Sequence, residues 1–542
     1  MSVYKFLARL LFALCLGSAV GLLLTSSASA AGSSVEQPTA SFPFSDGFES
    51  GSFGNGWTPG SAANGVAQIR TDDPHSGTYH AFIGQHQDDN AIASLDLLVN
   101  LANQTDVYLD YWWRSTGDLS LGAWDSGIYI SDDNGTNWKK IKNFGDNSHY
   151  SHEIVNLVDA AAKQGLNLNN HFLVRFYFER RNLGGRIGGV RLDDIRLSAS
   201  SQVTASFPLE NGFESATFPK GFYPLSANLG VAKIRDNSPH RGNKHVFLGQ
   251  DITGDARAAL YLLVDLSNPA QDVYLDFWWQ TTGSLAIGSG GSGVYISSDN
   301  GTNWKKIRNF SDNLHYSHEI INLSDAAAKQ GLNLNDHFLI SFHYEMTIGG
   351  RLGSVNLDDI RLTGHSNVLA PFPLRDGFET QTFEKGLYPA SRGVGIAEIT
   401  DETPHSGAYH VSLGQNLTGD ARAVLFILAD LSNQAEDVYL DFWWRTSGDF
   451  AVGSGGSGIY ISSDNGTNWR KIKNFGGNPA YTHEVINLSE AASAQGLNLN
   501  DHFLVSFHYE RTVGGRLGSI RIDDIRLRGG SSNHIYLPFI EK

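Results

Sequence analysis

The chain has 542 residues, of which 18% are charged and 41% are hydrophobic, and its formal net charge at pH 7 is −16. This acidic balance argues against a nucleic-acid partner, because phosphate binding draws on clustered lysine and arginine. The 59 glycines and the 11% of aromatic residues indicate many tight turns between strands.

The first thirty residues predict export. Lys5 and Arg9 precede an apolar run over residues 10–24, and the small residues 28–30 follow it. This is the pattern of a cleaved secretory signal peptide, and the run is shorter than the roughly 20 residues needed to cross a bilayer. An uncleaved anchor is the alternative. Cleavage removes Cys15, the only cysteine, so the mature chain forms no disulfide. We expect a secreted or cell-surface protein of bacterial type with no membrane span.

Two segments recur along the chain. Asp46-Gly47-Phe48-Glu49 returns at 211–214 and 376–379, and the segment 192–195 returns at 357–360 and 522–525. The period of about 165 residues is far longer than the 20–50 residues of solenoids and propeller blades, so each copy should be a whole domain. The predicted domains are 41–200, 206–365 and 371–530. The tail 531–542 follows them and is apolar over residues 534–540.

Within a copy the dominant period is two. Apolar residues at 107, 109, 111 and 113 alternate with Tyr108, Asp110 and Trp112. Residues 338–345 show the same alternation. Both stretches predict strands with one face in a core. In the second copy we expect Ser324 to cap a short helix over 325–330 that ends at Gly331. Many strands without βαβ alternation predict an all-β fold of three tandem antiparallel jelly-roll β-sandwiches, each with one short helix.

A hairpin motif lies near the middle of each copy. Ser131, Asp133, Gly135 and Trp138 fit an Asp-box, with Asn137 in place of the usual threonine. Glycine supplies a positive φ, the aspartate binds turn amides and the tryptophan packs beneath, so we interpret the motif as a structural turn. A sialidase propeller would repeat it about every 45 residues, and here the spacing is about 165. The Asn-Gly-Thr sequons within it are interpreted as turn chemistry rather than glycosylation sites.

The order of five segments makes a resemblance specific. DGFESGSFGNGW, PHSGTYHAFIG, VYLDYWW, IYISDDNGTNWKKI and VRLDDIRL follow one another in the first copy. This order resembles the jelly-roll domains of the MAM and reelin-repeat kind, close to the concanavalin-like lectin and glucanase sandwiches. The resemblance covers nearly all of each copy, although the cysteines of eukaryotic MAM domains are missing. It implies an extracellular recognition or adhesion module that often carries a structural Ca²⁺.

Acidic residues at both ends of each copy are candidate Ca²⁺ ligands. In jelly rolls of this kind the first and last strands lie side by side, so these carboxylates should meet, and Ca²⁺ takes six to eight oxygens. Asp72 or Asp73, Asp236 and Asp401 are further possible oxygen donors. The alternative is that the acids cap turns or pair with Arg191 and Arg196. The predicted metal ligands are Glu49, Asp193, Asp194, Glu214, Asp358, Asp359, Glu379, Asp523 and Asp524.

The polar face of the VYLDYWW strand is the candidate ligand-binding surface. Aromatic rings beside carboxylates suit sugars, which present C–H patches and hydroxyls together. Neighbouring strands would add Tyr129 and, in later copies, His343 with Glu345 and His508 with Glu510. The alternative is that loops cover this face and its groups bond internally. The predicted binding residues are Tyr108, Asp110, Trp112, Tyr274, Asp276, Trp278, Tyr439, Asp441 and Trp443.

These observations predict a binding or adhesion protein rather than an enzyme. We expect weak, multivalent recognition of extracellular glycans or surface proteins. A structural spacer and a polysaccharide-cleaving enzyme are the alternatives. A retaining glycosidase needs two carboxylates about 5 Å apart, for which Asp110 with Glu179 or Asp276 with Glu345 are the candidates. The sequence lacks glucanase, hydrolase-elbow, zincin and P-loop motifs.

Overall fold

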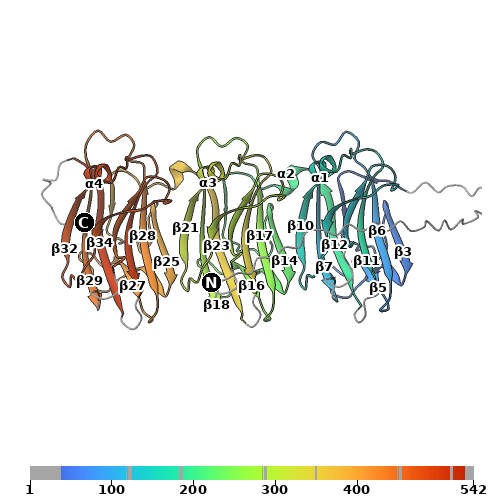
Figure 1. Ribbon diagram of the computed structural model, residues 1–542, viewed down its shortest axis with the longest axis horizontal. Helices are drawn as coiled ribbons and strands as arrows, with labels where there is room; N and C mark the ends of the chain where they lie inside the picture. The colour runs from blue at the N-terminus through green and yellow to red at the C-terminus, as the bar shows by residue number, and fades with distance from the viewer. Residues whose placement is uncertain are drawn as a thin grey trace, which may run out of the picture. The chain divides into compact units, whose positions relative to one another are not determined.

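The computed structural model describes residues 38–530, except residues 118, 120–124, 182–186, 284, 286–289, 348–350, 449, 451–454 and 513–516. Residues 39–542 belong to one compact unit, in which three β-sandwiches follow one another along the chain (Figure 1). The predicted signal peptide and the apolar tail lie outside the described residues. Within the described part, no helix has the length and apolar character required to cross a membrane.

The first sandwich consists of two sheets and one helix. Its elements are β1 (Ala40–Ser41), β2 (Phe44–Asp46), β3 (Trp57–Ala63), β4 (Gly65–Arg70), β5 (His80–Gln85), β6 (Ala91–Asn100), β7 (Tyr108–Thr116), β8 (Gly127–Ser131), β9 (Lys139–Asn143), β10 (Ser151–Asn156), α1 (Leu157–Lys163), β11 (Phe172–Arg180) and β12 (Gly189–Ser198). One sheet has the order β1-β6-β11-β8-β9 with β3 also on β6, and the other has the order β10-β7-β12-β5-β4 with β2 on β12. The early strand β2 therefore pairs with the last strand β12 as expected, with Asp46 opposite Ile195.

The second sandwich repeats this arrangement after the linker helix α2 (Ser200–Val203). Its elements are β13 (Leu209–Asn211), β14 (Phe222–Asn228), β15 (Gly230–Arg235), β16 (His245–Gln250), β17 (Ala256–Val264), β18 (Val273–Gly283), β19 (Gly293–Ser297), β20 (Lys305–Asn309), β21 (Ser317–Asn322), α3 (Leu323–Lys329), β22 (Phe338–Met346) and β23 (Gly353–Gly364). The sheets have the orders β15-β16-β23-β18-β21, with β13 on β23, and β14-β17-β22-β19-β20.

The third sandwich follows the short 3₁₀ helix η1 (His365–Asn367). Its elements are β24 (Leu374–Asp376), β25 (Leu387–Gly393), β26 (Gly395–Thr400), β27 (His410–Gln415), β28 (Ala421–Ala429), β29 (Val438–Gly448), β30 (Gly458–Ser462), β31 (Arg470–Asn474), β32 (Thr482–Asn487), α4 (Leu488–Ala494), β33 (Phe503–Arg511) and β34 (Gly518–Gly529). Its sheets have the orders β26-β27-β34-β29-β32, with β24 on β34, and β25-β28-β33-β30-β31. The predicted all-β class of antiparallel sandwiches is confirmed.

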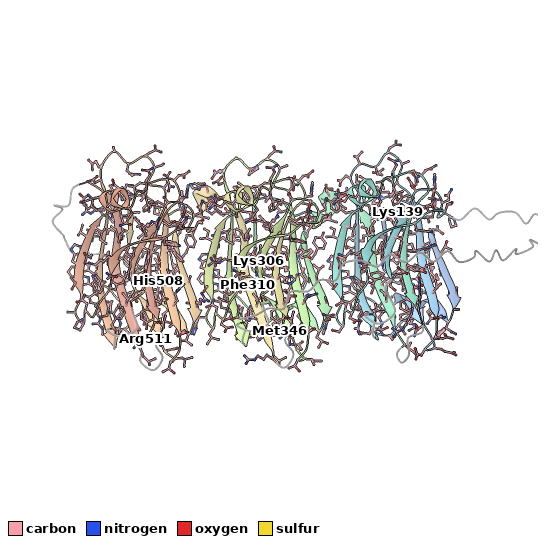
Figure 2. All side chains as sticks on the ribbon, viewed as in Figure 1. Lys139, Lys306, Phe310, Met346, His508 and Arg511 are labelled. Carbon is pink, nitrogen blue, oxygen red and sulfur yellow. The ribbon has the colours of Figure 1, made fainter. Side chains whose placement is uncertain are left out.

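Each core lies between the two sheets of a sandwich. The alternation predicted from the sequence is confirmed, because Leu109 and Tyr111 of β7 and Phe342 and Tyr344 of β22 are fully buried. Figure 2 shows the side chains that fill the second sandwich, among them the buried Met346. Each sandwich has its own cluster of buried apolar residues.

The short helix of the second sandwich begins two positions earlier than expected, at Leu323 instead of residue 325. Asn322, rather than Ser324, is the N-cap of α3, and its side chain accepts a hydrogen bond from the amide of Asp325. The Ser324 hydroxyl instead accepts from the amide of Val273 at 3.0 Å, which fixes the helix to β18. The prediction of the capping residue was therefore wrong, because this tertiary bond leaves the capping role to the asparagine at the end of β21.

Consecutive sandwiches are joined by direct contacts that occur twice. Ser151 Oγ donates to the carbonyl of Ser226 at 2.9 Å and accepts from its amide at 2.7 Å, and Ser317 bonds Ser391 at 3.0 and 2.7 Å in the same way. Tyr223 is buried at the first junction and Tyr388 at the second. Both junctions also hold a small apolar cluster. Each sandwich is thus anchored to the next by buried groups.

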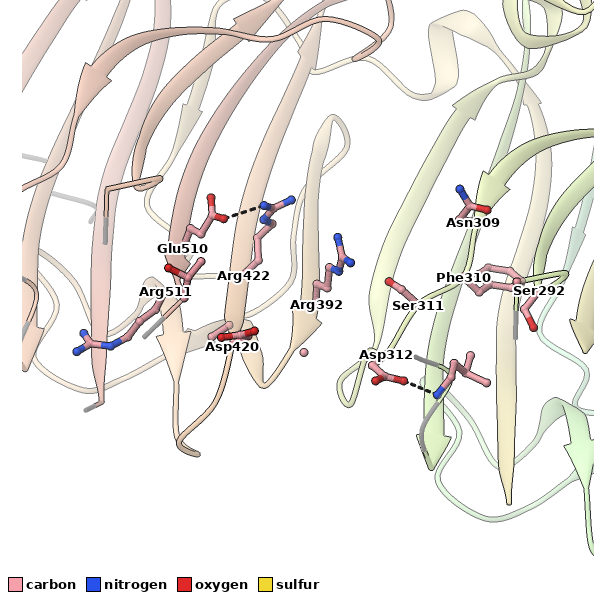
Figure 3. Close-up of a pocket in the computed structure, with 15 residues that line it drawn as sticks. Ser292, Asn309, Phe310, Ser311, Asp312, Arg392, Asp420, Arg422, Glu510 and Arg511 are labelled. Atoms are coloured by element: carbon pink, nitrogen blue, oxygen red, sulfur yellow. Dashed lines mark hydrogen bonds and ion pairs between the residues drawn. The ribbon is translucent and has the colours of Figure 1, made fainter. Parts of the chain in front are cut away.

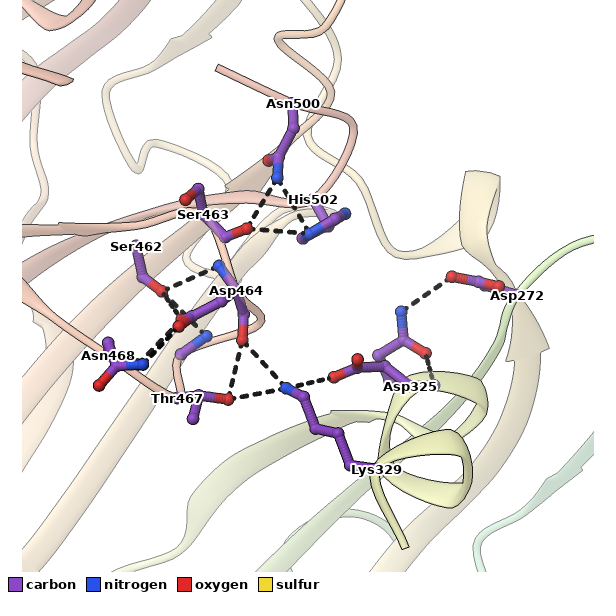
Figure 4. A network of polar contacts seen from close by, with 12 residues as sticks. Asp272, Asp325, Lys329, Ser462, Ser463, Asp464, Thr467, Asn468, Asn500 and His502 are labelled. Atoms are coloured by element: carbon purple, nitrogen blue, oxygen red, sulfur yellow. Dashed lines mark hydrogen bonds and ion pairs between the residues drawn. The ribbon is translucent and has the colours of Figure 1, made fainter. Parts of the chain in front are cut away.

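A lysine at the end of each junction helix extends the contact. Lys329 Nζ lies 2.7 Å from Asp325 and donates to the Thr467 hydroxyl at 2.9 Å and the Asp464 carbonyl at 3.5 Å, both in the Asp-box turn of the third sandwich (Figure 4). Lys163 reaches Thr302 of the second sandwich at 2.7 Å. The Asp-box hairpins of the second and third sandwiches are therefore also contact surfaces for the helix of the preceding sandwich.

Candidate functional site

The aromatic and acidic face predicted on the VYLDYWW strands is largely closed. Tyr108, Tyr274 and Tyr439 are at most 8% exposed, and their neighbours Asp110 and Asp276 are equally buried. Tyr108 and Tyr274 belong to the junction clusters with the following sandwich. The prediction of an open ligand-binding face is therefore wrong in the first two sandwiches, because the next domain covers it.

The tryptophans of this face are half-buried, and other rings cover both of their faces. Trp112 stacks between His75 and His152 with centroid distances of 3.7 and 4.4 Å, and Trp278 stacks between His240 and His318 at the same distances. Trp443 of the third sandwich stacks at 3.8 and 5.0 Å between His405 and His483. A sugar ring therefore has no free tryptophan face on which to stack.

The aspartates of this face hold the stacked histidines. Asp276 accepts a hydrogen bond from His318 at 2.6 Å and also pairs with Arg361. Hydrogen bonds and electrostatic attraction from these two partners keep the pKa of Asp276 below its usual value despite its burial. Asp110 and Asp441 bond His152 and His483 in the same way. The alternative interpretation of these residues as internal hydrogen-bond partners fits the structure.

A partly exposed aromatic and charged surface, whose rings also pack on the junction cluster, lies instead on the other sheet of the third sandwich. Residues 421, 423, 425 and 427 of β28 point into the core, so Arg422, Val424 and Phe426 point outward. Phe426 lies against Trp469 of the Asp-box hairpin at a centroid distance of 5.5 Å. Farther along this face, Arg422 forms an ion pair of 2.9 Å with Glu510 of β33. Two partly exposed rings and a charged pair therefore share one face.

This face is one wall of a cleft between the second and third sandwiches. The opposite wall is formed by β20 and the residues after it, which include Asn309, Ser311 and Asp312 (Figure 3). The cleft consists of three adjoining hollows with volumes of about 820, 610 and 370 Å³. Trp469 and Phe426 line the two smaller hollows, and Arg422 lines the two larger ones.

Charged groups of both signs are distributed along the cleft. Arg308 pairs with Glu319 at 2.8 Å, and Asp312 accepts a hydrogen bond from the amide of Leu285. Arg392 lies at the gap between the sandwiches in Figure 3 and is exposed. Next to Glu510, burial lowers the pKa of His508 to about 4, so this ring is neutral at pH 7 and offers one donor and one acceptor.

The junction between the first and second sandwiches has related chemistry. Arg257 pairs with Glu345 at 2.7 Å, and Tyr261 lies 4.9 Å from Trp304. Ala227 of β14 stands at the position that corresponds to Arg392 of β25. Arg392 is thus the clearest difference in charge between the two junctions.

The carboxylate pairs considered for glycoside cleavage are not neighbours. Asp276 lies on β18 and Glu345 on β22, which belong to different sheets of the second sandwich. Both side chains point away from the core, since Leu275, Phe277, Phe342 and Tyr344 point into it. Stacked sheets are about 10 Å apart, so the two carboxylates cannot approach the roughly 5 Å of a retaining pair. The same separation applies to Asp110 and Glu179.

The predicted metal ligands hold a loop in every sandwich. Glu49 accepts hydrogen bonds from the amides of Thr78 and Tyr79 at 2.9–3.1 Å, and Asp193 accepts from the amides of His75 and Ser76 at 2.9 and 3.2 Å. Asp194 accepts from His75 at 2.8 Å. Glu214 with Asp358 and Asp359, and Glu379 with Asp523 and Asp524, make the equivalent bonds. The carboxylates therefore meet at one loop, as the expected strand pairing requires.

The third sandwich adds a carboxylate that the sequence did not single out. Asp376 Oδ1 accepts from the amide of Phe378 at 2.7 Å, while its buried Oδ2 has no hydrogen-bond partner among the described residues. In the first sandwich the equivalent oxygen of Asp46 accepts from the Trp57 indole at 2.9 Å. Leu387 replaces that tryptophan, and burial raises the pKa of Asp376 to about 6. An unsatisfied buried carboxylate calls for a proton or a cation.

The donor set of the third sandwich fits a hard cation better than the other two. Asp376 lines a cavity of about 710 Å³ together with Glu379, Glu384 and Asp524. Ligand atoms of His405, Asp523 and Asp524 also lie within 4.8 Å of one another, the one such group of three found in the described residues. Ca²⁺ prefers oxygen ligands, and four carboxylates line this cavity. No three of these four have oxygen atoms within 4.8 Å of one another among the described residues, so an ion would have to draw them together. In the second sandwich the position of Asp376 is Asn211.

The remaining acids near this loop bind arginines. Asp72 pairs with Arg191 at 2.5 Å, and Asp73 pairs with Arg114 and Arg191. Asp72 and Asp73 thus follow the alternative interpretation, in which acids neutralise arginines on the sheet surface. The structure gives no ion pair for Asp236 or Asp401 among the described residues.

The Asp-box is a structural hairpin, as predicted. Asp133 Oδ1 accepts from the Ser131 hydroxyl at 2.8 Å and from the amide of Asn137 at 2.9 Å. These bonds lower the pKa of Asp133 to about 2. Asn134 and Gly135 both have positive φ, which is the backbone geometry expected for such a turn.

One family model and several solved structures are similar to parts of the chain. Residues 129–140 match the family model described as BNR/Asp-box repeat. No curated protein matches the chain in sequence. One similar solved structure is the CBM22-1-CBM22-2 tandem domain of Paenibacillus barcinonensis Xyn10C, with 10% identity and a TM-score of 0.22 over 60% of this chain and 99% of that one.

Two further structures are similar at the same level. TmCBM61 in complex with β-1,4-galactotriose has 17% identity and a TM-score of 0.20, covering 28% of this chain and 94% of that one. SGBP-B from a xyloglucan utilization locus in Bacteroides uniformis has 11% identity and a TM-score of 0.18, covering 83% and 98%. These similarities concern the fold alone. Membership of the MAM and reelin-repeat group stays a prediction.

Proposed function

We propose that this protein is a non-catalytic extracellular binder of oligosaccharides and that the cleft between the second and third sandwiches holds the sugar. The proposal is supported by the spatial order of the side chains along one wall of the cleft. Phe426 and Trp469 provide apolar ring surface, and the Arg422–Glu510 pair follows on the same face. Arg392 stands beside them at the gap.

This arrangement suits a saccharide for two physical reasons. Sugar rings expose patches of C–H bonds that pack on aromatic rings. Their hydroxyl groups both donate and accept hydrogen bonds, so they can bridge a guanidinium and a carboxylate such as Arg422 and Glu510. Since the aromatic and the charged parts lie in adjoining hollows, a chain of several sugar residues matches the cleft better than a monosaccharide.

The junction between the first and second sandwiches supports a second, weaker site. Its ring pair Tyr261–Trp304 and its ion pair Arg257–Glu345 reproduce most of the cleft chemistry, with Ala227 in place of Arg392. Two sites on one chain of directly joined sandwiches would raise avidity for a polymer by roughly 10²–10⁴. The proposed valency is thus two, set by the junctions, rather than three.

We also propose a structural Ca²⁺ at the cavity of Asp376, Glu379, Glu384 and Asp524 in the third sandwich. The ion would satisfy the buried Asp376 oxygen and brace the loop that carries Ser406 and Gly407. It has no part in sugar binding, because these residues do not line the cleft.

Titration of the full chain with oligosaccharides tests the proposed site. The β-1,4-galactotriose and the xyloglucan named with the similar structures suggest a practical first library of oligosaccharides. We expect a dissociation constant near the millimolar range, about −4 kcal/mol. The double variant Arg422→Gln, Glu510→Gln should lower the affinity at least tenfold, because it removes both charged partners. Its melting temperature should hardly change, since partly exposed ion pairs contribute little to stability.

The matched control is Arg257→Gln, Glu345→Gln in the other junction. This variant should retain the stronger binding event and lose only the weaker one. Equal affinities of the Arg422/Glu510 variant and the wild type would refute the proposed cleft. If no glycan of a broad array binds the folded chain, the directly joined sandwiches are better explained as a spacer.

A further inference from the structure

The junctions use a recurring pair of surfaces that can be named by their residues. The outgoing face of the second sandwich carries Tyr274, Ile320 and Lys329, and it meets the third sandwich. The incoming face of the third sandwich contains a cross-strand row formed by Tyr388, Phe426 and Ser506. The corresponding row of the second sandwich is Tyr223, Tyr261 and Ser341.

Each residue of the incoming row makes a specific contact or leaves space for one. The buried tyrosine donates a hydrogen bond from its hydroxyl to the linker, from Tyr223 to Val203 at 2.7 Å and from Tyr388 to Val368 at 2.5 Å. The second aromatic ring lies against the Asp-box tryptophan. The buried serine is small, which leaves room for that tryptophan and for the neighbouring domain.

The first sandwich has a different row at the same ladder positions. Thr58 pairs with Asp96, and Asp96 pairs with Arg175. Asp96 and Arg175 form a bidentate ion pair with distances of 2.7 and 2.8 Å. The guanidinium of Arg175 lies over the Trp138 ring at 3.8 Å. An exposed threonine and a charged pair thus replace two aromatic rings and a serine.

The outgoing face of the third sandwich is changed as well. The helix position of Lys163 and Lys329 is Ala494 in α4, so no side chain there can reach an Asp-box turn. Arg528 lies over the Tyr439 ring at 5.2 Å, where Ser198 and Thr363 stand in the other sandwiches. Val485, the counterpart of the junction residue Ile320, is 37% exposed.

We infer that the first and third sandwiches are end caps that stop this interface from forming between copies of the chain. The interface is heterologous, because its two surfaces differ, and repeating it between molecules would give an open filament. Docking a second copy on the first sandwich would bury the Asp96–Arg175 pair and lose the tyrosine bond. Burying a charged pair costs desolvation free energy that a poor fit does not repay. In the part of the chain that the structure describes, this pair of surfaces therefore forms only the two internal junctions.

Restoring the faces in the full-length chain tests the inference. The first variant, Thr58→Tyr, Asp96→Tyr, Arg175→Ser, gives the first sandwich the incoming row of the second. The second variant, Ala494→Lys, Arg528→Thr, gives the third sandwich the outgoing face of the second. Sedimentation velocity from about 10 µM to 1 mM reports the assembly state, the upper limit matching the effective concentration that a short linker provides. Circular dichroism and thermal melting check that each variant is folded.

We expect the wild type and each variant alone to remain monomeric over this range. An equimolar mixture of the two variants should form a 1:1 complex, and the chain that combines both sets of changes should form open polymers. Wild-type self-association, or a mixture that stays monomeric at 1 mM although both variants are folded, would overturn the inference.

The reverse exchange keeps the test decisive if a restored face does not fold. Tyr388→Thr, Phe426→Asp, Ser506→Arg places the cap row of the first sandwich inside the second junction. The third sandwich should then detach from the second, which raises the radius of gyration in small-angle scattering and exposes the linker 364–370 to protease. An unchanged radius of gyration and an uncut linker would show that the row does not control docking.

Discussion

The second and third sandwiches share their core and the contacts to the preceding domain, and they differ at a few polar positions. Tyr223 and Tyr388 are buried alike at their junctions, and His245 and His410 are buried alike within their domains. Asn211 in one domain is Asp376 in the other, and Ala227 is Arg392. The packing of the core and of the junction is thus the same in the two domains, while the polar groups of the surface and of one cavity differ. At each differing position, the residue of one domain provides the control substitution for the other.

Truncation of the junction tyrosines should have the largest effect. Tyr223→Ala and Tyr388→Ala each remove a buried ring and its hydrogen bond to the linker, and large-to-small changes of buried aromatic rings cost about 3–5 kcal/mol. We expect similar losses in the two variants, measured as the change in the free energy of urea unfolding. A loss below about 1 kcal/mol in either variant would mean that its junction contributes little, and the two junctions would no longer be equivalent.

Calcium should distinguish the two domains. At a free Ca²⁺ concentration about 100 times the dissociation constant, binding adds roughly 2.7 kcal/mol to stability. We expect the melting temperature to fall in EDTA, and Asp376→Asn, which copies the second sandwich, to abolish this response. Asn211→Asp should introduce a second response because it places a carboxylate at the equivalent position. Identical wild-type melting curves in Ca²⁺ and in EDTA would remove the proposed ion.

Acidification should affect both domains in the same direction. Burial lowers the pKa of His245 and His410 to about 4, and no nitrogen of either ring has a hydrogen-bond partner in the described structure. Since the unfolded pKa is about 6.5, the unfolded chain binds more protons between these values, and stability falls as the pH drops from about 6.5 to 4. The loss is roughly 2 kcal/mol per histidine between pH 7 and 5.

Three buried aspartates of these two domains oppose this effect, and a variant is required to separate the contributions. Burial raises the pKa of Asp358 and Asp376 to about 6 and that of Asp523 to about 7, so their contribution to stability is lost as the pH rises through these values. His245→Gln and His410→Gln leave the aspartates in place. Urea unfolding at pH 7 and pH 5 should show a smaller acid loss in each variant than in the wild type. Parallel pH profiles of variant and wild type would contradict the assignment.

The sequence was sufficient for the fold and insufficient for the site, for physical reasons. Period-two alternation identifies which side of a strand faces the core, and Leu109 and Phe342 are buried as it requires. It also marks Tyr108 and Asp110 as facing away from the core, but it does not say that another domain covers them. The residues that pack around Tyr108 come from more than 90 positions away in the chain, such as Tyr223 and Leu263 of the next sandwich.

The proposed cleft had a weak signal in the sequence. His508 and Glu510 were noted as polar positions of an outward face, whereas Arg422, Phe426 and Arg392 were not, because they lie on strands that alternation alone does not place next to one another. The orphaned oxygen of Asp376 became visible only when Leu387 was found in the place of Trp57. Comparison of the three copies position by position would have revealed both differences.

Blocking the cleft with a covalent label tests the central claim most directly. Arg392→Cys introduces a thiol at an exposed position of the cleft, and a bulky maleimide attached there should fill it without touching the core. Ala227→Cys with the same label is the matched control in the other junction. If the cleft holds the sugar, the label at position 392 should reduce oligosaccharide affinity at least tenfold in a titration, while the label at 227 should leave the stronger binding event intact. Unchanged affinity of the chain labelled at 392 would contradict this claim.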